Sequence, residues 1–305
     1  MRQHDPYTPI LEALRYQNSC ETEEQFLERL KLSKPVMKNL RKSYDCGACR
    51  VDYSSCDTRA AYMLGYYPHY IEIAHTELSK IENNIFPSNW ETEEVNACFL
   101  GGGPGPEILG WITFLQEHFP NVNTANAYVF DKHSEDWKFC LEVTQKIIAP
   151  NYWKKKLNII PIPFDLLKDD KCLSKEAIFA IENSNFIVMQ NCLNDQPGTS
   201  TSFTNLENIF ENLIHIIENI PPDSLVLMAD LKFPRARDLM RKVENEITNN
   251  AIGRPIVPVC NKPYCIYSSL VFPTLLNHLF TGEDGLIGKR KTEYFSSLIY
   301  KDYIF

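Results

Sequence analysis

Residues 95–106 read VNACFLGGGPGP, and this stretch decides the fold predicted for the chain. The apolar half, Val95–Leu100, predicts a short strand, and Pro106–Phe119 predicts the helix that follows it. Between them the turn Gly101–Gly105 has glycine at every position but one, so Cβ atoms are missing where the backbone bends sharply and meets a ligand. The free N–H groups and the positive dipole end of the helix face the same turn, which therefore predicts a ligand-binding site.

The spacing of these glycines separates the turn from two common phosphate-binding motifs. A dinucleotide fingerprint, G-x-G-x-x-G, would need its third glycine where this chain has Pro106. A Walker-type loop would need Gly-Lys-Ser or Gly-Lys-Thr, which is absent. A tight strand–helix turn that binds nothing stays open as an alternative.

Strand-like and helix-like runs alternate from residue 95 onward. This alternation predicts an α/β fold, a mainly parallel Rossmann-like sheet with helices on both faces. Ligands bind such sheets beyond the carboxyl ends of the strands, where the strand order reverses. Seven strands are predicted, at or near Val95–Leu100, Ala125–Asp131, Asn158–Phe164, Phe186–Gln190, Leu225–Leu231, Tyr264–Phe272 and Tyr294–Tyr300. The helices expected between them are Pro106–Phe119, Ser134–Ile148, Thr204–Asn219 and Pro234–Thr248.

The N-terminal part of the chain has a different, helical pattern. Residues 1–92 predict a helical extension, and residues 93–305 predict the α/β domain. Two short amphipathic helices are expected first, at Glu21–Leu32 and Ser33–Ser43. A stronger helix begins with Asp57 as its N-cap, and Pro68 predicts a kink or a fresh start after Tyr67.

Acidic residues end the next two predicted strands. Asp131 ends the second strand, where a carboxylate can accept hydrogen bonds from both hydroxyl groups of a ribose. Phe164 and Asp165 end the third strand. Each acid alone could instead cap a helix, but three successive strand ends now carry groups suited to a nucleotide-like ligand.

The G-x-G-x-G turn and Asp131 together resemble class I S-adenosylmethionine-dependent methyltransferases, over residues 93–302. The resemblance implies S-adenosylmethionine as the cofactor, with Asp131 at the ribose and Phe164 and Asp165 at the adenine. The cofactor-binding residues that it implies are Gly101, Gly102, Gly103, Pro104, Gly105, Asp131, Phe164, Asp165 and Gln190. The family commonly has an acid two positions before the first glycine, where this chain has Phe99. This departure leaves open a non-catalytic interaction protein that keeps the fold and the cofactor.

The same resemblance places the methyl acceptor at the end of the fourth strand. Asn191 and Asp195 follow this strand and are the predicted catalytic residues there, although the Asn/Asp-Pro-Pro-aromatic motif of amino-directed relatives is missing. Methyl transfer is an in-line displacement that mainly needs proximity and alignment, and a base such as Asp195 matters only for an acceptor that carries a proton. The N-terminal extension is expected to act as a substrate lid, with Tyr66 and Tyr70 as an aromatic wall of the acceptor site. Tyrosines on such a helix more often belong to the core.

The charge of the chain bears on the acceptor. A net charge of −8 disfavours a broad surface for nucleic acid, so a nitrogen or oxygen atom of a small molecule or peptide is the predicted acceptor. Residues 186–195, FIVMQNCLND, and the tyrosine-bearing helix also resemble Rsm22-like ribosomal small-subunit methyltransferases. An RNA acceptor therefore stays open as an alternative.

The ten cysteines predict reduced thiols in a cytoplasmic protein, because the N-terminus lacks the pattern of a secretion signal. No apolar run has membrane-spanning length, so no membrane association is predicted. Cys46 and Cys49 have metal-like spacing, with Cys56 close behind, but Cys260 and Cys265 form a looser and distant pair. Tetrahedral zinc needs two suitable cysteine pairs, or one pair together with histidines, so no metal site is predicted. The sequence predicts no oligomeric state.

Overall fold

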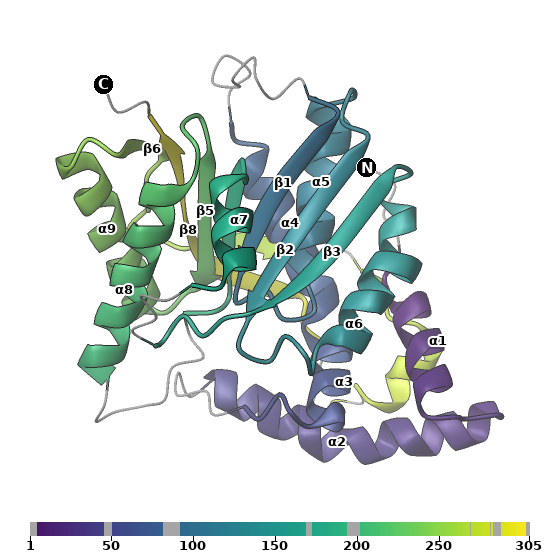
Figure 1. Ribbon diagram of the computed structural model, residues 1–305. Helices are drawn as coiled ribbons and strands as arrows, with labels where there is room; N and C mark the ends of the chain where they lie inside the picture. The colour runs from purple at the N-terminus through teal and green to yellow at the C-terminus, as the bar shows by residue number, and fades with distance from the viewer. Residues whose placement is uncertain are drawn as a thin grey trace.

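A computed structural model of the chain has an eight-stranded sheet at its centre (Figure 1). The structure describes residues 5–45, 51–81, 92–168, 173–193, 202–268, 270–280, 282 and 288–302. The strands are β1 (Glu94–Leu100), β2 (Thr124–Asp131), β3 (Lys156–Pro163), β4 (Phe186–Gln190), β5 (Leu225–Leu231), β6 (Gly253–Val257), β7 (Tyr264–Tyr267) and β8 (Lys291–Lys301). Their order in the sheet is β3-β2-β1-β4-β5-β8-β6, and β7 also pairs with β8.

The strands β1 to β5 are parallel to one another, which confirms the predicted Rossmann-like α/β fold. β8 runs antiparallel to β5, β6 and β7. The sequence does not predict β6, a short strand that contains Pro255 and is tolerated because it lies at the edge of the sheet. The predicted strand at Tyr264–Phe272 is shorter and ends at Tyr267. Strand order reverses between β1 and β4, which is where ligands bind in folds of this kind.

Helices surround the sheet and also form the N-terminal part of the chain. They are α1 (Tyr7–Gln17), α2 (Glu23–Asp45), α3 (Cys56–Gly65), α4 (Tyr67–Leu78), α5 (Pro106–His118), α6 (Lys138–Val143), α7 (Lys175–Glu182), α8 (Ser202–Asn219) and α9 (Pro234–Asn249). A π-helical turn, Thr144–Ile148, continues α6, and short 3-10 helices lie at Ala149–Asn151 and Thr274–His278. The sequence analysis predicts neither α1 nor α7. Within the described residues, no helix is long and apolar enough to cross a membrane.

α2 is one continuous helix where the sequence analysis predicts two. Its buried residues recur at steps of three and four on both sides of Pro35, at Phe26, Leu30, Ser33, Met37, Leu40 and Tyr44. This unbroken buried face stabilises the helix enough to offset the hydrogen bond that Pro35 removes. The break predicted by Pro68 does occur, at Tyr66 between α3 and α4. Asp57 lies in the first turn of α3 instead of at its N-cap, which is Ser55.

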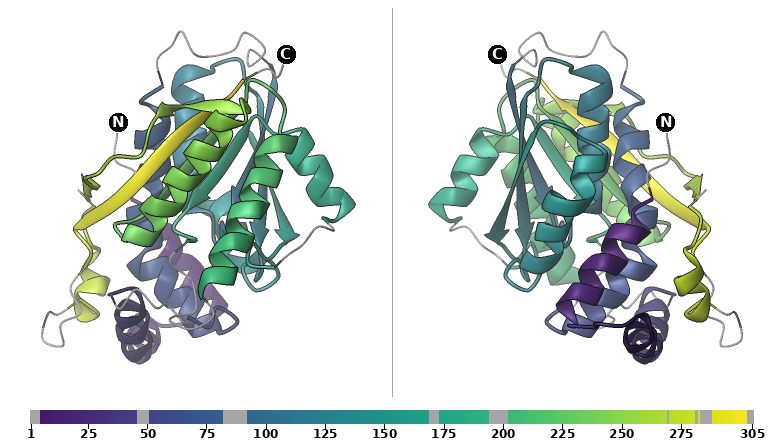
Figure 2. Two further views of the ribbon diagram at one scale, coloured as in Figure 1. Left: turned by 90° about the vertical axis from the view of Figure 1, so that its left-hand side faces the viewer. Right: turned by 90° about the vertical axis from the view of Figure 1, so that its right-hand side faces the viewer.

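Two hydrophobic clusters cover the two faces of the sheet. Ala97 and Phe99 of β1 pack with residues of α1 to α6, whereas Cys98 and Leu100 pack with residues of α7, α8 and α9. This alternation follows from the period of two along a strand, and the two faces with their helices are visible in Figure 2. The N-terminal helices therefore share a core with the sheet. The division at residues 92 and 93 stays a prediction, because residues 82–91 lie outside the described part of the chain.

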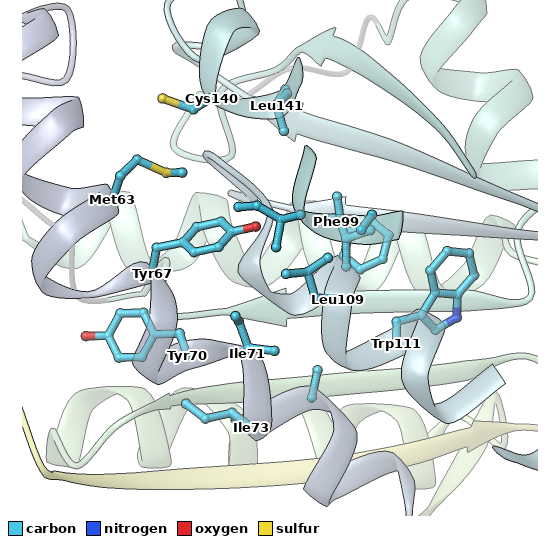
Figure 3. Close-up of a cluster of buried hydrophobic side chains, with 14 of the residues drawn as sticks. Met63, Tyr67, Tyr70, Ile71, Ile73, Phe99, Leu109, Trp111, Cys140 and Leu141 are labelled. Carbon is cyan, nitrogen blue, oxygen red and sulfur yellow. The ribbon is translucent and has the colours of Figure 1, made fainter. Parts of the chain in front are cut away.

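Phe99 is a core residue. It is fully buried, and its ring lies 5.5 Å from that of Trp111 in an edge-on arrangement. Figure 3 shows it among side chains of α4 and α5, including Tyr67 and Leu109. The position where the resembled family has an acid is thus used here to pack helices onto the sheet.

Candidate functional site

A pocket of about 830 Å³, partly open to solvent, lies at the carboxyl ends of β1 to β4. α2 passes below these strand ends in the view of Figure 1 and contributes Tyr44 to the pocket. The lining residues are Tyr44, Tyr53, Tyr62, Gly101–Pro104, Glu107, Asp131–His133, Trp137, Phe164–Leu167, Gln190–Cys192 and Ile209. Every predicted cofactor residue except Gly105 therefore lies at one pocket. Gly105 begins α5 behind the turn.

The glycine turn is shaped by positive φ angles and, at Gly101, by a contact too close for a side chain. Gly101 has a φ of +65°, and a Cβ atom there would lie 2.4 Å from the Cβ atom of Cys192. Gly103 has a φ of +50°, another conformation that favours glycine. Behind the turn, the Thr144 hydroxyl donates to the carbonyl of Pro104 over 2.8 Å. The turn is therefore held rigidly, with the ends of β1 and β4 in close contact.

The carboxylate of Asp131 lies directly beside the glycine turn in the pocket and is oriented by backbone amides. Its Oδ2 accepts from the N–H of Gly103 over 3.0 Å, and its Oδ1 accepts from the N–H of His133 over 2.7 Å. Burial raises the pKa of the Asp131 carboxyl, although these two amides act in the opposite direction. Each carboxylate oxygen can accept a second hydrogen bond, so Asp131 is suited to bind a pair of neighbouring hydroxyl groups.

Glu107 is a second acid of the pocket, and the sequence analysis misses it. It lies in the first turn of α5 and is only 2% exposed. Burial raises the pKa of its carboxyl to about 8, with a smaller contribution from the charge of Asp131. A glutamate in the first turn of a helix ordinarily interacts with the helix dipole, so its position in the sequence gave no sign of a ligand-binding role. A buried carboxyl at a pocket wall is suited to a cationic ligand, whose charge would favour its ionised form.

The end of β4 contributes polar atoms that lack partners. The Nε2 of Gln190 donates to the carbonyl of Tyr70 over 2.9 Å. The Oε1 of Gln190 and both side-chain polar atoms of Asn191 are buried without a hydrogen-bond partner among the described residues. Asn191 also has a φ of +57°. Buried polar groups in proteins are nearly always paired, so unpaired atoms at a pocket wall indicate a place for a bound ligand. The predicted catalytic residue Asp195 lies outside the described residues.

The third strand ends with the apolar and acidic pair that the sequence predicts. The Phe164 ring packs edge-on against Phe130 at 5.6 Å and borders the pocket beside Leu166 and Leu167. The Oδ1 of Asp165 accepts from the N–H of Leu167 over 3.1 Å. This edge of the pocket therefore offers an apolar surface next to a carboxylate, which suits a purine ring with an exocyclic amino group.

An aromatic wall closes the pocket on the side of the N-terminal helices. Tyr44 and Tyr53 share a 2.6 Å hydrogen bond between their hydroxyl groups, and Trp137 packs against Tyr53 and Tyr62 at 5.2 Å and 5.7 Å. The sequence analysis does not select any of these four residues, because the helices and the loop that carry them meet only in the folded chain.

The two predicted wall tyrosines, Tyr66 and Tyr70, do not line this pocket, but Tyr66 lines a neighbouring hollow, so their role at the acceptor stays a prediction. Tyr70 is fully buried, with its ring 6.0 Å from that of Tyr66 and 6.3 Å from that of Tyr62. Tyr62, which lies on α3 before the break at Tyr66, borders the pocket instead.

Comparison with known proteins finds only distant similarity to solved structures. No protein-family model matches this chain, and no curated protein matches it in sequence. A methyltransferase homolog from Pyrococcus horikoshii has 12% identity and a TM-score of 0.41, over 72% of this chain and 64%, less than two thirds, of that chain. A methyltransferase from Pyrococcus furiosus has 10% identity and a TM-score of 0.37, over 72% and 81%. A Listeria monocytogenes protein, proposed to be a class I S-adenosylmethionine-dependent methyltransferase, has 11% identity and a TM-score of 0.41, over 98% and 88%. At these values the function has to be inferred from the residues of the pocket.

Metal ligands do not gather in the part of the chain that the structure describes. No group of three or more His, Cys, Asp or Glu side chains is arranged there to hold a metal ion. Cys56, Cys260 and Cys265 are exposed. Cys46 and Cys49 lie outside the described residues, so the metal prediction remains untested.

Proposed function

We propose that this chain is a class I S-adenosylmethionine-dependent methyltransferase that transfers a methyl group to a nitrogen or oxygen acceptor. One observation carries the proposal. At the point where strand order reverses, the amide-held carboxylate of Asp131 and the glycine turn Gly101–Gly105 share a pocket with the unpaired polar atoms of Gln190 and Asn191. A hydroxyl-binding acid, a turn without Cβ atoms and unsatisfied buried polar groups fit a nucleoside ligand.

Different residues of the pocket bind the ribose, the adenine and the methionine part of the cofactor. Asp131 binds the ribose hydroxyl groups, and Phe164 with Asp165 binds the adenine. Glu107 is the counter-ion of the methionine ammonium group, in place of the acid that the family carries at the position of Phe99. Gln190 presents its unpaired Oε1 to the same end of the cofactor.

Catalysis by such a site consists mainly of alignment. When bound, S-adenosylmethionine supplies a methyl group on a sulfonium centre, ready for in-line displacement. Asn191 lies at the end of β4 with both polar atoms available, and it orients the acceptor by hydrogen bonds. Exclusion of water by the tyrosines of α2 and α3 helps to hold the acceptor in a reactive position. Asp195 keeps its predicted role as a base for an acceptor that carries a proton.

The rival function is a non-catalytic protein that only binds the cofactor. Its support from the sequence is Phe99, where an acid is expected. Glu107 weakens that support, because a buried carboxyl at the pocket can take over the task of the missing acid. An RNA acceptor is the other alternative, and the net charge of −8 disfavours it.

Calorimetry with four adenosine-containing ligands tests the proposal. The purified protein is titrated with S-adenosylmethionine, S-adenosylhomocysteine, NAD⁺ and ATP. The first two should bind with one site per chain and the others should not, because a third glycine and a P-loop lysine are absent. Binding of NAD⁺ alone would overturn the proposal. An assay for S-adenosylhomocysteine release with a panel of acceptors then separates an enzyme from a cofactor-binding protein.

A further inference from the structure

A second hollow lies beside the cofactor pocket, at the carboxyl end of β5. It has a volume of about 1150 Å³, part of it open to solvent. Tyr44 lines both hollows, and Leu231 at the end of β5 borders only the second. Both hollows therefore open at the same edge of the sheet, where an acceptor in one could meet a cofactor in the other.

The second hollow is basic, in contrast to the acidic chain. Its described lining residues include four cationic side chains and one acid, while the chain has a net charge of −8. The cations are Arg41, Lys232, Lys289 and Lys291, and the acid is Glu293. Lys232 and Lys291 both donate hydrogen bonds to Glu293, and one carboxylate between two lysines leaves this group with a net positive charge. Such a local surplus attracts an anion.

Lys289 connects the basic hollow to the cofactor pocket through one tyrosine. Its Nζ donates to the hydroxyl of Tyr70 over 3.1 Å and lies 4.3 Å from the centroid of that ring. The carbonyl of the same Tyr70 accepts from Gln190, at the wall of the cofactor pocket. Tyr70 therefore links Lys289 of the second hollow to Gln190 of the cofactor pocket, and its contact with Lys289 helps to fix the position of that positive charge.

The rest of the hollow is suited to the organic part of a small ligand. Met37, Phe233 and Phe280 supply apolar surface. Phe233 is the N-cap of α9, so the positive end of that helix dipole adds to the charge of the lysines. A concave site with apolar walls and a few charged groups is typical of small-molecule recognition.

We propose that this second hollow binds the methyl acceptor and selects a small molecule that carries a phosphate or carboxylate group. The inference rests on the proposed function. A long polyanion such as RNA would need a basic surface that extends over many phosphates, whereas these cations are confined to one hollow of an acidic protein.

The test uses protein saturated with S-adenosylhomocysteine, so that the cofactor pocket is filled. Pyrophosphate and citrate are titrated as phosphate and carboxylate probes, and a single-stranded RNA oligonucleotide as a polyanion. Lys289→Met and Arg41→Met each remove one positive charge from the hollow. Two variants are used so that the test still works if one of them fails to fold. Lys154→Met is the matched control, because Lys154 lines a different hollow beside Pro68.

At least one probe should bind with one site per chain and lose about tenfold in affinity in both Lys289→Met and Arg41→Met, with no change in Lys154→Met. The stronger probe identifies the preferred anionic group. If neither small anion binds, or if Lys154→Met weakens binding as much as Lys289→Met, the inference is wrong. Preferential binding of the RNA would overturn it in favour of a nucleic-acid acceptor. Failure to bind S-adenosylhomocysteine at the outset would instead contradict the proposed function.

Discussion

Replacement of Glu107 by glutamine should change two properties in opposite directions: the stability of the protein without cofactor, and its affinity for the cofactor. Burial raises the pKa of the carboxyl from 4.5 to about 8, so the folded protein keeps a proton that the unfolded chain loses between these values. The contribution of this proton to the free energy of unfolding is fully present below pH 4.5 and is lost as the pH rises toward 8. At pH 7 the loss amounts to about 3 kcal/mol, at 1.36 kcal/mol for each pH unit. Glutamine stays neutral, so the variant should keep this stability.

Urea unfolding of both proteins without cofactor, at pH 5 and pH 8, measures this effect. The variant should become more stable than wild type as the pH rises, by about 3 kcal/mol or somewhat more. His69, whose pKa is lowered to about 3 by burial, influences both proteins alike and cancels in the difference, whereas the charge interaction between Asp131 and Glu107 is part of the measured effect. Equal loss of stability in the two proteins would refute the buried, proton-holding state of Glu107.

The affinity for the cofactor should rise with pH, whereas the stability of the protein without cofactor falls. If Glu107 pairs with the methionine ammonium group, binding of S-adenosylhomocysteine near pH 7 should release a proton, seen as a dependence of the binding enthalpy on the buffer. Wild-type affinity should rise between pH 6.5 and 8.5. Glu107→Gln should release no proton and bind about tenfold more weakly at pH 8.5, with a smaller loss at pH 7, where the wild-type carboxyl must first ionise. Unchanged affinity and unchanged proton release would place the ammonium group elsewhere.

Three further predictions concern the turn, the acceptor and the cysteines. Gly103→Ala and Gly282→Ala both put a side chain at positive φ and should each cost about 1 kcal/mol in urea unfolding. Only Gly103→Ala should lose affinity for S-adenosylhomocysteine in calorimetry. If Gly103→Ala and Gly282→Ala bind equally well, the cofactor site lies elsewhere. Asn191→Gly relieves the left-handed backbone, so it should bind S-adenosylhomocysteine normally but slow methyl transfer; a parallel loss of cofactor affinity would mean that the two sites are wrongly separated. Elemental analysis should find no stoichiometric zinc or iron, because only Cys46 and Cys49 have ligand-like spacing, and about one zinc per chain would favour the ribosomal alternative.

Much of the fold could be predicted because the relevant patterns are local. The apolar strand Val95–Leu100, the glycine turn and the helix after it are continuous in the sequence, and the parallel sheet follows from the alternation of strands and helices. The position of Asp131 at the second strand end followed from the same alternation. β6 is short and its sequence does not alternate between apolar and polar residues, so only its pairing with β8 reveals it as a strand.

The rest of the site depends on tertiary packing. Glu107 looks like any glutamate in a first helical turn until the fold buries it beside Asp131. Tyr44 comes from α2, which reaches the strand ends only because an unbroken apolar face carries the helix past Pro35. Tyr62 lies on α3 and Tyr70 on α4, and the break at Tyr66 between these helices decides which of the two borders the pocket.

Titration of wild type, Asp131→Ala and Asp165→Ala with S-adenosylhomocysteine tests the central claim most directly. The carboxylate of Asp131 accepts hydrogen bonds from the N–H groups of Gly103, in the glycine turn, and of His133, and it is proposed to bind the ribose hydroxyl groups. Wild type should bind one equivalent, Asp131→Ala should lose about 1.5–3 kcal/mol of binding free energy, and Asp165→Ala should lose less. Retained affinity in Asp131→Ala, or the absence of binding to wild type, would contradict a cofactor site at this pocket.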